Sequence, residues 1–162
     1  MAHGDPTDEL KETRGLNPLP SNWLTMFFEK TYEVPTKGEG DVIDLTPLLE
    51  RFLSESSVSD GVCTIAATGS TYAVTTVEHE PGLVEDLKRV LQELVPRGPV
   101  YAHDARWGDG NGYAHVRASL VGPSVSFAVV GGKPRLGTWQ QPVLLDFDNR
   151  PRTRRVSFCI AG

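Results

Sequence analysis

The stretch QPVLLDFDNRPRTRRVSFCIA, residues 141–161, decides the fold that we predict for this chain. Its two halves, 141–148 and 153–161, alternate apolar and polar side chains. Antiparallel strands show this alternation when one face of their sheet is covered and the other faces water. The polar segment between the halves contains proline, which suits a connection between strands. The stretch therefore indicates a largely antiparallel sheet near the C-terminal end.

Upstream, apolar and β-branched runs predict further strands. The run 61–68 is apolar enough to be a central strand, and the others are expected at 23–34, 42–45, 70–80 and 124–130. The polar, proline-containing segment 1–20 is expected to be a mobile tail. That leaves 21–162 as a single domain, which is consistent with a chain of 162 residues.

Three helices are expected beside these strands. The clearest covers 81–95, because its apolar residues form one stripe at helical spacing: Leu83, Leu87, Val90, Leu91 and Leu94. A second is expected over 47–56, after Thr46 as N-cap. A third is expected between an Asn111 cap and Leu120. Strands combined with a few helices predict an α+β domain, in which the helices pack on a mixed, largely antiparallel sheet.

Composition limits the classes of partner. The chain has a formal net charge of −5, so its surface as a whole does not attract nucleic acid or anionic lipid. No apolar segment approaches the ~20 residues of a membrane span, and the N-terminus lacks a signal pattern. A cytoplasmic location is therefore expected. Cys63 and Cys159 lie in apolar runs, which predicts buried free thiols. The sequence contains no CxxC, Walker, HExxH or GxSxG motif.

The segment HDARWGDGNGYAHVRASLVG, residues 103–122, gathers polar groups ahead of and within a predicted helix. Asn111 and His115 are four residues apart, so a helix places them on one face, with His103 and Asp104 preceding it. Exposed helix amides beside imidazoles suit an anionic group such as phosphate. The alternative is that Asp104 and Asn111 only stabilise a glycine-rich turn.

Three further groups are candidates for a site. Glu78 ends an apolar strand, where a carboxylate can be a base, a metal ligand or simply a solvated strand end. Arg152 and Arg154 share strand parity with the apolar residues after them, which predicts guanidiniums at the rim of a covered cavity, unless they form a solvated basic turn. Trp139 and Gln140 can stack on and hydrogen-bond an aromatic ring, although a tryptophan can equally pack in the core.

From roughly Thr25 to the C-terminus, the chain resembles the YjbQ-like family. The resemblance is carried, in this order, by the segments TTVE, YAHD, DGNGYAHVRASLVG, GGKPRLGTWQ and RPRTRRV. The resemblance implies an α+β domain that assembles as a homotrimer. Members of the family carry the name secondary thiamine-phosphate synthase. That name implies a transferase that joins hydroxymethylpyrimidine diphosphate to thiazole phosphate with loss of diphosphate.

The resemblance also implies roles for individual residues. His103, His115 and Glu78 would be catalytic and would hold Mg²⁺ or another divalent metal. Gly69-Ser70-Thr71 stands where many members have His-Thr-Thr, so Glu78 would replace a missing metal ligand. A small phosphorylated substrate would be bound by Thr71, Asp104, Asn111, Trp139, Gln140, Arg152 and Arg154. Two alternatives remain open: a phospho-ligand binding protein without catalysis, and a metal-assisted hydrolase of a small phosphorylated molecule.

Overall fold

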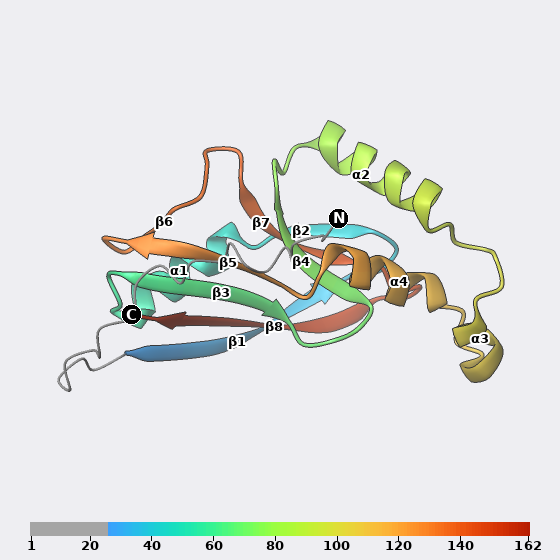
Figure 1. Ribbon diagram of the computed structural model, residues 1–162, viewed down its shortest axis with the longest axis horizontal. Coiled ribbons are helices and arrows are strands. Elements are labelled where there is room, and N and C mark those ends of the chain that lie inside the picture. The colour runs from blue at the N-terminus through green and yellow to red at the C-terminus, as the bar shows by residue number, and fades with distance from the viewer. Residues whose placement is uncertain (1–25) are drawn as a thin grey trace, which may run out of the picture.

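Strand pairing builds two antiparallel sheets in the computed structural model, which describes residues 26–162 (Figure 1). The five-stranded sheet A and the three-stranded sheet B contain only antiparallel pairs within this part of the chain. In spatial order, sheet A consists of β1 (Phe27–Thr36), β8 (Arg152–Ala161), β3 (Gly61–Ala67), β5 (Ser124–Val130) and β6 (Lys133–Pro134). Sheet B consists of β2 (Asp41–Asp44), β7 (Gln141–Asp146) and β4 (Tyr72–Val77).

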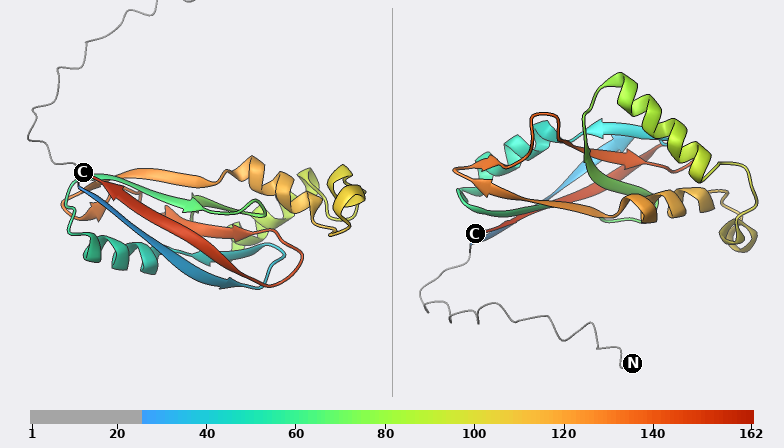
Figure 2. Two further views of the ribbon diagram at one scale, coloured as in Figure 1. Left: turned by 90° about the horizontal axis from the view of Figure 1, so that it is seen from below. Right: turned by 45° about the horizontal axis from the view of Figure 1, so that its top comes forward.

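Four helices accompany the sheets in the described residues: α1 (Thr46–Ser56), α2 (Pro81–Leu94), α3 (Ala102–Trp107) and α4 (Gly112–Val121). The predicted α+β fold is therefore confirmed. In Figure 2, α2 and α4 lie on the side of sheet B away from α1, and α3 lies beyond the end of α4. Two apolar clusters follow from this arrangement. One joins the two sheets and α1, and the other joins sheet B to α2 and α4.

The alternation predicted for the two C-terminal strands is right for β8 and wrong for β7. In β8, Val156, Phe158 and Ile160 are buried between more exposed neighbours. In β7, five consecutive residues are buried, because the strand is central in sheet B and both faces of that sheet are covered. Leu144 joins the cluster between the sheets, while Leu145 joins the cluster under α2 and α4.

The predicted stripe of α2 packs much less than its pattern suggested. Only Leu91 is buried, whereas Leu94 remains 70% exposed. The helix begins where predicted, at Pro81, and the Glu80 carboxylate accepts hydrogen bonds from the amides of its first turn. Amphipathic spacing predicts a helix, but how much of its apolar face is buried depends on the elements that pack against it.

Other sequence predictions have mixed outcomes. The helix expected after Thr46 begins at Thr46 itself, whose hydroxyl has no partner in the described part of the chain. Cys63 is a buried free thiol, and burial raises its pKa to about 12, whereas Cys159 is free but only half-buried. No helix in residues 26–162 is long and apolar enough to cross a membrane. The tail expected at 1–20 lies outside the described residues.

Candidate functional site

Two short helices bring His103 and His115 together. The six-residue α3 carries His103 and was not predicted, whereas α4 lies within a residue of the helix expected after Asn111. Gly108 and Gly110 between the helices adopt φ values of +69° and +65°, which side chains rarely tolerate. The resulting tight reversal places the two imidazole centroids 4.4 Å apart.

Two carboxylates flank the His103 imidazole. Its Nδ1 lies 3.3 Å from Asp109 Oδ1 and 3.6 Å from Asp104 Oδ1. One ligand atom from each of these three residues lies within 4.8 Å of the other two. The Nδ1 atom is buried and makes no hydrogen bond to any residue in the described range. This juxtaposition of one imidazole nitrogen and two carboxylates suits a divalent cation.

Asp104 also has a local structural role. Its Oδ1 accepts a hydrogen bond of 2.8 Å from the Gly112 amide, the first residue of α4. Asn111 occupies the N-cap position as predicted, but its own side chain does not cap the helix. A carboxylate from α3 therefore satisfies part of the helix N-terminus that we expected to receive an anionic ligand.

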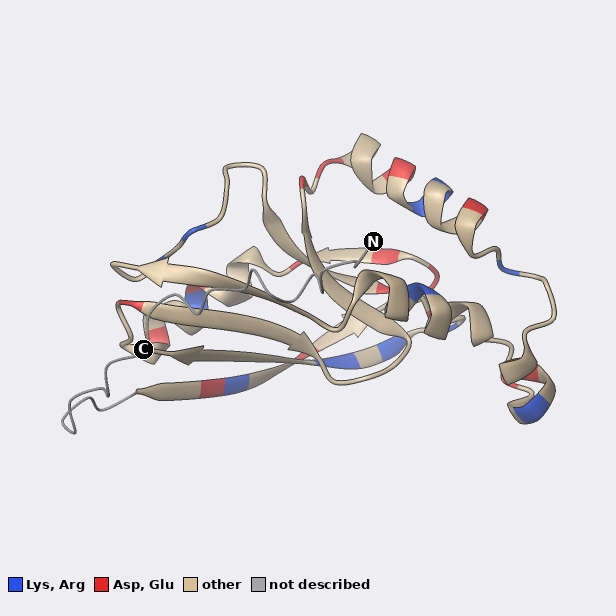
Figure 3. Cartoon of the chain, in the orientation of Figure 1, with Lys and Arg blue, Asp and Glu red and all other residues tan. Residues whose placement is uncertain are grey.

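The predicted arginines lie at this end of the molecule, but both contact buried carboxylates. Arg154 makes a forked ion pair with Asp146, through Nε at 2.7 Å and Nη2 at 2.6 Å. Arg152 Nε donates to Asp148 Oδ2 at 2.8 Å, and its side chain remains 34% exposed. Figure 3 shows the basic residues gathered where β8 begins. Arg154 thus points inward, as its parity predicted, but its fork holds the two sheets together and is not free for a ligand.

The contacts between these arginines and aspartates favour the charged forms of both kinds of side chain. Burial by itself raises the pKa of Asp148, but hydrogen bonds from Arg152, Asn111 and the Asn149 amide outweigh it, so the pKa lies below its ordinary value. Burial likewise lowers the pKa of Arg154, yet the contacts with the Asp146 and Asp148 carboxylates raise it above the usual range. The ion pairs therefore persist at neutral pH.

Asn111 connects the arginine group to the imidazole group. In one orientation its amide Nδ2 donates to Asp148 Oδ1 at 3.3 Å. With the amide turned over, the nitrogen donates to both Asp109 oxygens at 3.2 Å. Thr71 Oγ1 also contacts Asp148, at 3.4 Å. The Asn111 amide thus lies between Asp148, which Arg152 contacts, and Asp109, which flanks His103, and in each orientation it donates to one of these two carboxylates.

A cavity of about 270 Å³ opens beside these contacts. We call it the aspartate–arginine cavity; it is lined by Asp109, Asn111, Asn149, Arg150 and Arg152. Asn149 Nδ2 donates to the Asp109 carbonyl at 2.8 Å, which fixes the β7–β8 connection against the α3–α4 turn. Sequence reasoning missed the acidic half of this site, although Asp146 and Asp148 are two residues apart and so share one face of an extended segment.

Three predicted site residues lie elsewhere. Glu78 is exposed just beyond β4, and Val77 pairs with Gln141, next to Trp139 and Gln140. Trp139 is 68% exposed and does not pack in the core. Thr71 precedes the opposite end of β4, and a six-residue strand spans about 20 Å. Within one chain, the structure groups His103 with Asp104 and Asp109, and an extended strand separates Glu78 from the imidazoles, so the metal set of His103, His115 and Glu78 stays a prediction.

Comparison with known proteins shows which family the chain resembles. The chain matches the family described as "UPF0047 protein YjbQ-like" over residues 30–162. It is 41% identical to a UPF0047 protein of Archaeoglobus fulgidus over 116 residues, which cover 72% of this chain and 87% of that relative. A UPF0047 protein of Methanocaldococcus jannaschii is 34% identical over 140 residues, covering 86% of this chain and 96% of the relative.

Solved structures agree with the fold. A YbjQ-like protein of unknown function from Sulfolobus solfataricus has a TM-score of 0.81 at 29% identity, covering 86% of this chain and 99% of that one. An uncharacterised YjbQ/UPF0047 protein from Clostridium acetobutylicum has a TM-score of 0.74 at 32% identity, covering 81% and 98% respectively.

These names correct one expectation. The relatives carry only the designation UPF0047, and the Sulfolobus structure is described as a protein of unknown function. The prediction that family likeness marks the chain as a transferase and thiamine phosphate synthase is therefore wrong. What the related proteins have in common with this chain is sequence similarity and the fold.

Proposed function

The chain belongs to the YjbQ-like UPF0047 family, and from this premise we propose that it binds a divalent cation and, with it, a small phosphorylated molecule. The observation that carries the proposal is the buried His103 Nδ1, which has no hydrogen-bond partner in the described range and faces Asp104 and Asp109. An imidazole beside carboxylates favours Zn²⁺ or Mn²⁺ over Mg²⁺, which prefers an all-oxygen site.

The spacing of these three groups supports a bound ion. Ligand atoms that surround a metal at about 2.0–2.2 Å lie at most about 4.4 Å from one another. The ligand atoms of His103, Asp104 and Asp109 already lie within 4.8 Å of one another. Small side-chain rotations bring them into coordination distance. The hydrogen bond from Gly112 restrains the Asp104 carboxylate, which limits the rotation that it requires.

A cation also explains how an anion enters a site with many carboxylates. A phosphate group alone would meet more negative than positive side chains here: Asp104, Asp109, Asp146 and Asp148 against Arg150, Arg152 and Arg154. A bound divalent cation reverses that balance beside the aspartate–arginine cavity. The half-exposed Arg152 and the exposed Arg150 then supply donors for phosphate oxygens. Phosphate binding is therefore expected to depend on the cation.

Calorimetry tests the cation and the anion separately. Mn²⁺ or Zn²⁺ is titrated into the wild-type protein, into His103→Ala and into the matched control His79→Ala, an exposed histidine outside the cluster. Binding is expected in the wild type and the control and not in His103→Ala. Inorganic phosphate and glycerol phosphate are then titrated with and without the cation. Equal cation binding by His103→Ala and the wild type would refute the proposal.

A second candidate function, metal-assisted hydrolysis of a phosphorylated molecule, is favoured by His115. Its ring lies against that of His103 at an interplanar angle of 37°, and its imidazole makes no hydrogen bond to another side chain in the described residues. It is thus available to move a proton while His103 holds the cation. Phosphate release from p-nitrophenyl phosphate by wild type and His115→Asn, both loaded with cation, distinguishes hydrolysis from binding alone. Binding without release leaves the first function in place.

A further inference from the structure

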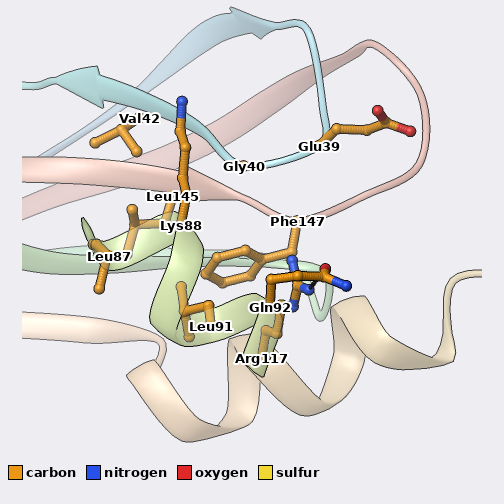
Figure 4. Close-up of a pocket in the computed structure, with 10 residues that line it drawn as sticks. All are labelled: Glu39, Gly40, Val42, Leu87, Lys88, Leu91, Gln92, Arg117, Leu145 and Phe147. Atoms are coloured by element: carbon orange, nitrogen blue, oxygen red, sulfur yellow. Dashed lines mark hydrogen bonds between the residues drawn. The ribbon is translucent and has the colours of Figure 1, made fainter. Parts of the chain in front are cut away.

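A second cavity lies on the other side of the β7 segment, beneath α2 (Figure 4). Asp146 and Asp148 pair with Arg154 and Arg152 on one side of this segment, whereas Leu145 and Phe147 alternate with them and line the cavity under α2. Its volume is about 220 Å³. Cavities of about 150 Å³ already accommodate benzene, so this space can hold one ring or a short branched chain.

The walls of the cavity are mainly hydrocarbon: Val42, Leu87, Leu91, Leu145 and Phe147. The space exists because α2 packs on sheet B chiefly through Leu91 and leaves most of its surface exposed. Atoms that line an unfilled space lose dispersion contacts on that side. An apolar ligand body would restore those contacts, and it would lose water-exposed surface at the same time.

One end of the cavity carries a buried positive charge. Arg117, from α4, is only 7% exposed. Its Nε and Nη2 donate to the Val95 carbonyl at 3.0 and 2.8 Å, and Nη2 also donates to Gln92 Oε1 at 2.6 Å. Both acceptors are neutral, and no hydrogen bond within the described residues uses Nη1. The guanidinium also lies over the Tyr113 ring, at 5.0 Å from its centroid, but no carboxylate in the described residues pairs with it, so an anion that reaches Nη1 gains a charge-assisted contact.

A second cation stands at the rim. The Lys88 stem passes close to Gly40, where a side chain's Cβ would lie 3.6 Å from Lys88 Cγ. Figure 4 shows Arg117 at one end of the cavity, the Lys88 ammonium directed toward the opposite rim, and the Glu39 carboxylate turned away. Glu39 is paired instead with Arg97. Two cationic groups therefore border a mainly apolar space without an acidic side chain directed into it.

We propose that this cavity binds a small carboxylate with an apolar body, such as an aromatic or short branched-chain acid. The carboxylate contacts Arg117 Nη1, the Lys88 ammonium at the rim adds electrostatic attraction at longer range, and the body packs against Leu87, Leu91 and Phe147. Apolar walls favour this class over inorganic phosphate, because they provide no donors for the remaining oxygens of a phosphate. The site does not depend on the cation or phosphate proposed above.

Benzoate is the probe that tests this inference, with benzyl alcohol as its uncharged analogue. Calorimetry on the wild-type protein is expected to give a dissociation constant for benzoate in the range of about 0.1–1 mM. Benzyl alcohol is expected to bind at least about tenfold more weakly, because it cannot neutralise Arg117. Equal affinities of the two probes, or no benzoate binding at about 10 mM, would overturn the proposal.

Two variants on α2 locate the binding. Leu87→Trp fills the cavity, and Val90→Trp, on a part of the helix that does not line it, is the matched control. Benzoate affinity is expected to fall about tenfold or more in Leu87→Trp and to stay at the wild-type value in Val90→Trp. Lys88→Gln, an exposed change that leaves the apolar walls intact, is expected to weaken benzoate about threefold and benzyl alcohol not at all.

A cooperative thermal unfolding transition verifies that each variant is folded. If Leu87→Trp does not fold, Lys88→Gln still tests the proposal. Wild-type affinity for benzoate in a folded Leu87→Trp, or in Lys88→Gln, would contradict the assigned location. Displacement of benzoate by inorganic phosphate would also contradict it, because the two anions would then share one site. Failure of benzoate to bind leaves the cation titration of His103→Ala unaffected, so the two proposals fail separately.

Discussion

At the scale of single residues, the Arg154–Asp146 pair shows how a side chain suited to ligand binding can be used in the fold. Arg154 belongs to sheet A and Asp146 to sheet B, so their forked ion pair joins the two sheets where the apolar cluster between them ends. Asp146 is fully buried and also accepts a hydrogen bond from Thr36. Every oxygen of this carboxylate therefore has a partner, which makes a buried charge tolerable.

Replacing one partner of this pair is expected to destabilise the fold strongly. Arg154→Met leaves the Asp146 charge buried without its cation, and the free energy of unfolding should fall by about 3–5 kcal/mol. The double variant Arg154→Met, Asp146→Leu is expected to recover most of that loss in urea unfolding. Arg155→Met, its exposed neighbour on β8, should change stability by less than about 0.5 kcal/mol. A double variant as unstable as Arg154→Met would contradict this account.

Asp148 makes stability depend on acid. Its pKa is lower in the folded chain than the ordinary value of about 3.9. Its charged form therefore stabilises the fold at neutral pH, and that contribution is lost as the pH falls below about 4 and through the folded pKa. In urea unfolding between pH 7 and pH 3, Asp148→Asn is expected to lose less stability on acidification than the wild type. Glu85→Gln, on the exposed surface of α2, should follow the wild-type slope.

At the scale of elements, α2 differs from α1 and α4 in how little of its surface is buried. The stripe could be read from sequence because helical spacing depends only on residue order. Its burial could not be read in this way, because the position of α2 over sheet B depends on the turn at residues 78–80 and on the connection 95–101 to α3. The same holds for α3, whose six residues give no helical period long enough to recognise.

Two leucines of α2 test this description. Leu91→Ala is expected to lower the free energy of unfolding by about 2 kcal/mol or more, because it removes the one buried anchor of the helix. Leu94→Ala, in the same helix and 70% exposed, is expected to change it by less than about 0.5 kcal/mol. Chemical unfolding of the two variants under one set of conditions makes the comparison. Equal losses would mean that the stripe is covered along its whole length.

At the scale of the whole molecule, the predicted site is divided between two ends of sheet B. The imidazoles, Asn111 and the arginines meet at one end, whereas Glu78, Trp139 and Gln140 lie at the other. Large apolar side chains remain well exposed in the described chain, among them Phe27, Leu94, Trp107, Leu120 and Trp139. Exposed apolar surface of this kind is typical of proteins that assemble. We expect a neighbouring copy to bring the second group of residues to the first.

The homotrimer implied by the family resemblance is thus a prediction at this scale. Light scattering of the purified protein is expected to give three times the chain mass of 17.7 kDa. Diluting the protein over a wide concentration range should preserve that mass, since an interface that buries apolar side chains is stable. A mass of one chain would contradict the trimer. It would also leave Glu78 and Trp139 without a route to the aspartate–arginine cavity.

Residue order alone was enough to reveal the period of most elements and hence the class of fold, although β7 and α3 are exceptions. Alternation marked β8, an apolar run marked β3, and the cap at Asn111 marked α4, because each signal depends on neighbours along the chain. The sequence also predicted that the Arg154 side chain points inward, because it shares strand parity with apolar residues. The contacts that these side chains make depend on packing between elements that are far apart in the chain. The roles of Asp146, Arg117 and the cavity under α2 depend on strands and helices that are distant in sequence. Whether a charge is buried depends on how these elements pack together.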